Sequence, residues 1–134
     1  AFERQFEVMK GWKKKDILKF PLTATVGWDP KPWSDPESKR LHPDKITRWF
    51  SNPSQWERLL YRMKDFSDEF PEEHLAQKML ILDNWNEWGE GHYISPHTGG
   101  GFGYLQAVRK VFTHGNNLPD YRTPKDIGLG PYGS

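Results

Sequence analysis

The chain has 134 residues, enough for one domain of ordinary size and too few for two. Hydrophobic residues make up 35% and charged residues 28%, which excludes a disordered profile. The net charge of +1 gives no general attraction to nucleic acid or to an anionic membrane, and no stretch approaches the ~18 apolar residues of a membrane span. We therefore expect neither partner.

Cysteine is absent and tryptophan is abundant. The lack of cysteine excludes disulfide scaffolds and thiolate metal sites. It leaves the compartment undetermined, with a periplasmic or extracellular location slightly favoured over a cytoplasmic one. The seven tryptophans form either a rigid core or platforms on which flat ligands and sugar rings stack.

The first part of the chain predicts a helix, a strand and a loop. Apolar residues at spacings of three and four predict a helix over residues 2–14. Residues 22–27 predict a buried strand that enters a loop, because Gly27 ends the stretch and Pro30 and Pro32 follow it. A polar stretch comes next, with a short helix expected around residues 46–50.

The second part predicts a helix, a strand and a further helix. The clearest helix covers residues 53–70, where Asn52 as N-cap and Gln55 three residues later form a capping box. The apolar run 78–85 predicts a strand that is buried on both faces. Residues 102–113 then form an amphipathic helix.

Two parallel strands joined by a helix make a βαβ unit. Two such strands cannot form a stable sheet alone, since parallel strands need both faces and both neighbours covered. Either further strands have been overlooked, or the chain is one end of a larger α/β structure.

The stretch "DNWNEWGEGHYISP" places Glu87 and Glu90 three residues apart, between tryptophans and directly after the second predicted strand. Loop glutamates are often only solvated, or they cap the next helix. Flanking by Trp85 and Trp88, however, is expected to desolvate a carboxyl partly and to raise its pKa, which suits a general acid. A second, ionised carboxylate would supply a base, a nucleophile or a stabilising charge. Most glycoside hydrolases use two such groups to cleave a glycosidic bond.

Two rival motifs near these glutamates are weaker. The glycine run at residues 99–103 fits the spacing of neither G-x-G-x-x-G nor the P-loop, so a flexible loop is favoured. His92 and His97 with Glu90 do not have a recognised zinc spacing. We expect no metal and no cofactor.

The segments "WNEWGEGHYISP" and "GYLQAVRKVF", with "TVGWDPKPW" upstream, resemble the C-terminal signature of glycoside hydrolase family 99-like proteins. This group includes the WbsX-like domains of bacterial polysaccharide clusters, sometimes labelled glycosyltransferases, and it is related to the endo-α-mannosidases. The resemblance covers roughly residues 20–113.

The resemblance implies an α/β fold, namely the C-terminal part of a (β/α)8 TIM barrel: about the last two βα units and a preceding helix. Residues 1–115 would form this segment and residues 116–134 an irregular tail. The remainder of the barrel, from the same or another chain, or self-association, would supply the missing strands. The site would lie at the C-terminal ends of the strands, as in other barrel enzymes.

The resemblance also implies residue roles. Glu90 matches the general acid/base of the endo-α-mannosidases, and Glu87 matches the second carboxylate, which assists the 2-hydroxyl of the substrate in a retaining reaction. The residues expected to line the sugar subsites are Trp28, Asp29, Trp33, Trp88, His92 and Tyr93.

The sequence departs from the mannosidases at Gly89, where they tend to have His, and at His92-Tyr93, which replaces Thr-Gln. Ser95 stands where Glu usually precedes the proline. The first two changes put a mannose substrate in doubt. The change at Ser95 puts substrate contacts in doubt and leaves the glutamate pair intact.

The expected function is glycosidic bond cleavage in a bacterial or host polysaccharide or glycan, by a carboxylate pair acting on a carbohydrate substrate. One alternative is a non-catalytic carbohydrate-binding protein, which would not need two adjacent carboxylates. The other is a glycosyltransferase of polysaccharide biosynthesis, which the lack of an Asp-x-Asp metal motif disfavours.

Overall fold

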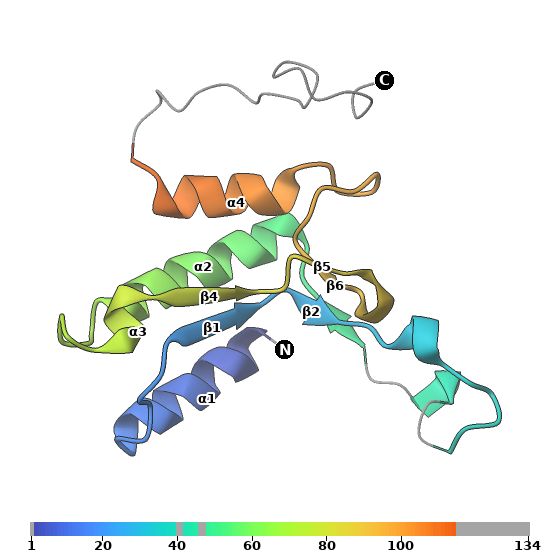
Figure 1. The fold of residues 1–134 in the computed structure, drawn as a ribbon, viewed down its shortest axis with the longest axis horizontal. Helices are drawn as coiled ribbons and strands as arrows, with labels where there is room; N and C mark the ends of the chain where they lie inside the picture. Colours follow the sequence, from blue (N-terminus) through green and yellow to red (C-terminus); the bar gives the residue numbers. More distant parts are fainter. Residues whose placement is uncertain (1, 40–41, 46–47, 115–134) are drawn as a thin grey trace.

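The computed structural model describes residues 2–39, 42–45 and 48–114. Helices and strands alternate along the chain and form a mixed α/β arrangement (Figure 1). The helices are α1 (Phe2–Lys14), α2 (Pro53–Ser67), α3 (Leu75–Lys78) and α4 (Gly103–Phe112). The strands are β1 (Leu22–Thr25), β2 (Gly27–Trp28), β3 (Trp49–Phe50), β4 (Leu80–Asp83), β5 (Asn86–Glu87) and β6 (His92–Tyr93). Three short 3-10 helices are η1 (Lys31–Trp33), η2 (Pro43–Lys45) and η3 (Trp88–Glu90).

The centre of the fold is the parallel pair β1–β4, in register from Leu22 opposite Leu80 to Thr25 opposite Asp83. The connection between them contains α2, so the predicted βαβ unit is confirmed. Both strands are shorter than predicted, because only four residues of each strand pair with the other. Their C-terminal ends point toward the small pairs β2–β3 and β5–β6 (Figure 1).

Helix α2 begins as the sequence predicts. The side chain of Asn52 accepts a hydrogen bond from the Gln55 backbone N–H at 2.9 Å, and the Gln55 side chain accepts one from the Asn52 N–H at 3.0 Å. These two bonds satisfy N–H groups that the helix leaves unpaired. The helix ends at Ser67 rather than at residue 70. Phe70 nevertheless stays buried, with its ring edge-on to Phe66 at 5.2 Å.

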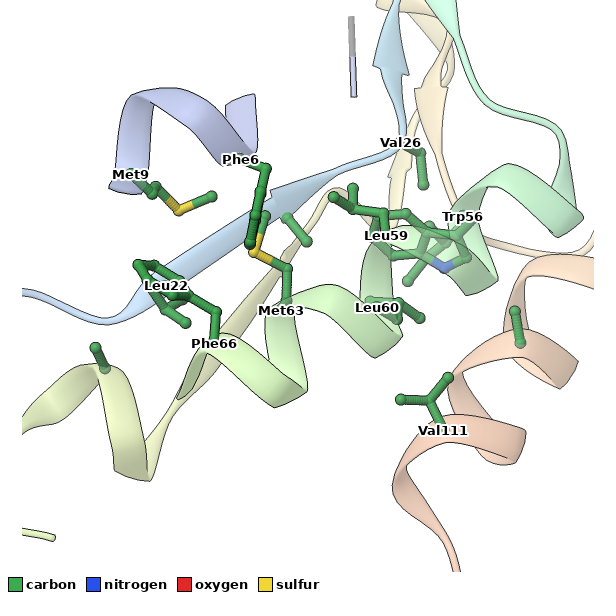
Figure 2. Close-up of a cluster of buried hydrophobic side chains, with 14 of the residues drawn as sticks. Phe6, Met9, Leu22, Val26, Trp56, Leu59, Leu60, Met63, Phe66 and Val111 are labelled. Atoms are coloured by element: carbon green, nitrogen blue, oxygen red, sulfur yellow. The ribbon is translucent and has the colours of Figure 1, made fainter. Parts of the chain in front are cut away.

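The hydrophobic core lies around α2, whose buried face meets α1 on one side and α4 on the other (Figure 2). Phe6 of α1 packs edge-on against Phe66 of α2 at 5.4 Å. Trp56, Leu60 and Met63 of α2 are fully buried. Burying a side chain of this size stabilises a fold by about 1.5–3 kcal/mol. The packing of α2 therefore fixes the strands whose ends carry the site.

The two strands are covered on one face only. Leu22 and Ala24 are fully buried, whereas Ile81 of β4 is 45% exposed. The prediction that the second strand is buried on both faces is therefore wrong for the described part of the chain. A groove of about 470 Å³ also opens beside β4, between α2 and α4, and includes Leu80 and Leu82.

The outer edge of β1 has a side-chain partner at Thr25. The Gln5 side-chain amide of α1 donates to the Thr25 carbonyl and accepts from the Thr25 N–H, both at 3.2 Å. One glutamine thus makes the pair of bonds that a neighbouring strand would make.

Two further expectations have different outcomes. Trp49 and Phe50, which belong to the short helix predicted around residues 46–50, form strand β3 and pair with β2. The helical prediction is wrong at these two residues, because the ladder with Gly27 and Trp28 holds them extended. The predicted tail 116–134 lies outside the described residues.

Candidate functional site

A hairpin at the C-terminal end of β4 carries both glutamates. Strands β5 and β6 pair in antiparallel fashion, with Glu87 opposite His92, and η3 between them contains Glu90. Gly91 turns the chain back at φ 56°, in the left-handed region that glycine adopts without steric cost. The pair of glutamates is therefore presented on one tight turn.

The loop that follows β2 holds this turn in place. The Asp29 backbone N–H donates to the Glu90 carbonyl at 2.6 Å. A Cβ added to Gly91 would lie 2.7 Å from the Asp29 Cβ, which shows how closely the two segments approach. The Trp33 indole nitrogen would lie 3.1 Å from a Cβ at Gly89. The two glycines of the turn thus allow contact with η1 and with Asp29.

His92 joins three parts of the site through one ring nitrogen. Its Nε2 lies 2.6 Å from Thr25 Oγ1, 3.0 Å from Asp83 Oδ2 and 3.1 Å from the Asp83 carbonyl oxygen. The side chain is only 14% exposed. The carboxylate oxygen and the carbonyl oxygen of Asp83 can only accept hydrogen bonds, so this nitrogen carries a proton. His92 therefore connects the hairpin to the ends of β1 and β4, and this Nε2 is already engaged within the protein.

The two glutamates differ in their exposure to solvent. Glu87 is exposed and Glu90 is half-buried. Trp85 is 52% exposed and Trp88 is 46% exposed. Only Glu90 therefore fits the expectation of a partly desolvated carboxyl, because both indoles beside Glu87 turn a large part of their surface to solvent rather than covering its carboxylate.

The aromatic residues of the site form a packed row. Trp88 lies against Tyr93 with ring centroids 4.0 Å apart, and Tyr93 meets the edge of His97 at 5.0 Å. His97 stacks on Tyr104 of α4 at 5.9 Å. Such contacts stabilise the hairpin against α4. His97 is thus a packing residue, and its ring leaves room only for a glycine at position 100, where a Cβ would lie 2.7 Å from it.

Tyr104 fixes the row to the end of β3. Its hydroxyl donates a hydrogen bond to the carbonyl of Ser51. Burial raises the pKa of the Tyr104 phenol above its ordinary value, and the nearby Tyr93 adds to the rise. The phenol therefore remains a donor at neutral pH.

The structure brings most of the predicted site residues together. Glu87, Glu90, Trp88, His92 and Tyr93 belong to the hairpin, and Asp29 and Trp33 touch its turn. Trp28 is 40% exposed in β2, next to Asp29 but paired through its backbone with Trp49.

Sequence reasoning missed Thr25, Asp83 and Tyr104. Thr25 and Asp83 could have been predicted, because they lie near the C-terminal ends of the two predicted strands, where barrel enzymes carry their sites. Tyr104 gave no such signal, because it reads as one member of an amphipathic helix.

Within the described ranges, no group of three histidine, aspartate or glutamate side chains is placed to hold a metal ion. No helix in this part of the chain is both long and apolar enough to cross a bilayer.

A glutamate pair at the ends of parallel strands, beside half-exposed tryptophans, is a combination found in carbohydrate-active α/β proteins. Comparison with family models agrees: the model described as "Glycosyltransferase WbsX" matches residues 2–108. The chain belongs to this WbsX family, and the match supports a carbohydrate-related activity. No curated protein and no solved structure matches the chain.

Proposed function

We propose that the chain carries the catalytic face of a glycoside hydrolase that cleaves glycosidic bonds in a polysaccharide or glycan. The observation that carries this proposal is the turn that holds Glu87 and Glu90 together, fixed by the 2.6 Å bond between Asp29 N–H and the Glu90 carbonyl. A binding protein would not need two carboxylates on one rigid turn. Exposed indole faces at Trp33 and Trp88 offer platforms for sugar rings.

The two glutamates take different roles in the proposed reaction. Glu90, in its protonated form, donates its proton to the leaving oxygen while the bond to the anomeric carbon breaks. As a carboxylate it then accepts a proton from the attacking water. Glu87 starts as a carboxylate and takes the proton of the reacting sugar's 2-hydroxyl, whose oxygen bonds to the anomeric carbon as the leaving oxygen departs. When water attacks that carbon, this bond breaks and the 2-oxygen takes the proton back from Glu87. The greater exposure of Glu87 suits the ionised role, because water stabilises its charge.

The test is turnover by matched glutamate variants. Glu90→Gln and Glu87→Gln should each lower reducing-end release from a panel of purified polysaccharides by about 10²–10⁴-fold. Binding of the same glycans should survive, since the amide keeps the size of the side chain. Glu72→Gln, an exposed loop residue far from the hairpin in sequence, is the control. Turnover by Glu90→Gln at the wild-type rate would refute the assignment.

A glycosyltransferase is the second candidate, because the family description carries that name. The same panel is therefore assayed with and without nucleotide-sugars and a divalent metal. If product forms only when a nucleotide-sugar and a divalent metal are both present, the chain is a glycosyltransferase and not a hydrolase. Glycan binding with neither product would favour a carbohydrate-binding protein.

We further propose that these strands belong to a (β/α)8 barrel that more strands complete, from the same polypeptide or another copy. The uncovered Ile81 supports this, since parallel strands are found buried on both faces. A native mass spectrum of the 134-residue chain tests it. A single-chain mass near 15.8 kDa for a folded sample would contradict completion by self-association.

A further inference from the structure

A small cavity lies beside the turn that carries Glu90. Its volume is about 100 Å³, and it is lined by Val26, Asp29, Phe50, Gly91, Tyr93 and Tyr104. Gly91 follows Glu90 directly, and Asp29 holds the Glu90 carbonyl. The cavity is therefore adjacent to the proposed acid/base residue.

The volume limits what can enter. One water occupies about 30 Å³ in the liquid, so the cavity holds about three waters. This space suits a group of two to four heavy atoms and is too small for a whole pyranose ring. A single substituent of a sugar is the fitting occupant.

The walls of the cavity divide into an apolar and a polar part. Val26 is 2% exposed and supplies an aliphatic surface, which Phe50 extends. Opposite in character is the Asp29 carboxylate, which accepts a bond from the Lys31 N–H at 3.0 Å. Arg48 lies 3.9 Å from the other carboxylate oxygen, where it forms an ion pair with Asp29 but no hydrogen bond. Asp29 therefore keeps capacity to accept another hydrogen bond.

Tyr104 adds a second acceptor rather than a donor. Its hydroxyl proton is already given to the Ser51 carbonyl, which leaves the oxygen's lone pairs for an incoming group. An ionised carboxylate and an accepting phenol favour a donor and oppose an anion. Both acceptors are half-buried, so leaving them without a donor would weaken binding of an analogue that lacks one.

We propose that this cavity receives a neutral, hydrogen-bond-donating substituent of the sugar bound at Glu90, namely a hydroxymethyl or an acetamido group. In either case the donor faces Asp29 and the carbon atoms contact Val26 and Phe50. A uronic acid carboxylate is disfavoured at this position, because Asp29 lines the cavity whereas Arg48, its ion-pair partner, does not. The inference rests on the proposed function, since it takes the sugar to bind at the glutamate pair.

The test measures binding rather than turnover. The probes are methyl glycosides of glucose, galactose and mannose, of their N-acetylated 2-amino counterparts and of their 6-carboxylates, in both anomeric forms. Binding is followed by NMR through the backbone amides of Gly91 and Tyr93. We expect at least one neutral sugar to shift both amides and its 6-carboxylate counterpart to bind about tenfold or more weakly, from like-charge repulsion.

Variants separate charge from shape. Asp29→Asn keeps the size of the side chain and should bring the neutral-to-carboxylate ratio close to one. Asp35→Asn, on the exposed loop beyond η1, should leave the ratio unchanged. Phe50→Ala, at a side chain that is 64% exposed, should weaken binding of both sugars without changing their ratio.

Three results would overturn the proposal: carboxylate sugars that bind as tightly as neutral ones, shifts that bypass Gly91 and Tyr93, or no binding by any probe. These results are distinct from those that would refute the proposed hydrolase activity. Equal binding of uronates would leave the loss of turnover in Glu90→Gln standing. Full turnover by that variant would refute the acid/base role while the sugar preference at Asp29 persisted.

Discussion

Replacing His92 by phenylalanine should loosen the hairpin from the ends of β1 and β4. The phenyl ring keeps the packing volume but removes the Nε2 atom that lies 2.6 Å from Thr25 Oγ1 and 3.0 Å from Asp83 Oδ2. The glutamates stay on the same turn, but the turn loses its connection to the sheet. The change therefore separates how the site is anchored from the chemistry it carries.

The expected cost follows from the exposure of each partner. The bond to the Thr25 hydroxyl contributes about 0.5–1.5 kcal/mol net. The Asp83 side chain is 41% exposed, so water can replace the ring there, and we assign this partner less than about 1 kcal/mol. The free energy of unfolding should fall by about 1–2 kcal/mol in total.

Urea denaturation measures this fall, and amide hydrogen exchange locates it in residues 86–93. His114→Phe, at an exposed position after α4, is the matched control and should change neither. In a double-mutant cycle with Thr25→Val, the coupling to His92 should be about 0.5–1.5 kcal/mol. Unchanged stability together with unchanged hairpin exchange would refute the anchoring role.

Three further predictions concern other parts of the fold. Asn52→Ala should lower the free energy of unfolding by about 1 kcal/mol, because the cap of α2 is lost, and an unchanged urea midpoint would contradict this. Gly11→Ala should raise it by about 0.5–1 kcal/mol, since an added Cβ there meets nothing within 4 Å, whereas Gly91→Ala should lower it by at least about 1 kcal/mol at φ 56°. A Gly91→Ala variant as stable as the wild type in the same assay would show that the hairpin turn does not need glycine. Because the pKa of Tyr104 is raised in the folded state, its contribution is complete below the unfolded value of about 10 and is lost as pH rises through the folded value. Between pH 9 and 11, the free energy of unfolding should therefore fall more steeply for the wild type than for Tyr104→Phe. Equal dependence on pH in the two proteins would contradict this link.

The elements that carry local signals were predictable. The capping box at Asn52 and Gln55 and the three-to-four spacing of apolar residues locate α2, and both belong to one short stretch of sequence. The two β-prone runs locate β1 and β4, and the helix between them makes their parallel pairing the expected one. The glutamate pair was likewise visible as a motif, although its place on a hairpin was not.

The remaining features depend on contacts between distant residues. Trp49 and Phe50 are residue types that favour strands, but a run of two is too short to predict one, and they form β3 by pairing with β2. Thr25 and His92 are 67 positions apart, so their contact cannot be inferred from local spacing. The exposure of Trp85 and Trp88 also depends on how the hairpin tilts. Sequence pattern thus predicted which residues gather, and tertiary contacts decided how they are oriented.

The bond that Gln5 makes to Thr25 affects how the protein behaves at high concentration. Along β1, backbone groups of successive residues point to opposite edges, so Thr23 and Thr25 are the two residues that face away from β4. Gln5 pairs with Thr25, so Thr23 is the one residue of this edge at which another chain could add. Such a short template is a poor seed for intermolecular sheets. Aggregation should therefore begin at the far edge of β4, and protective charges would be most useful there.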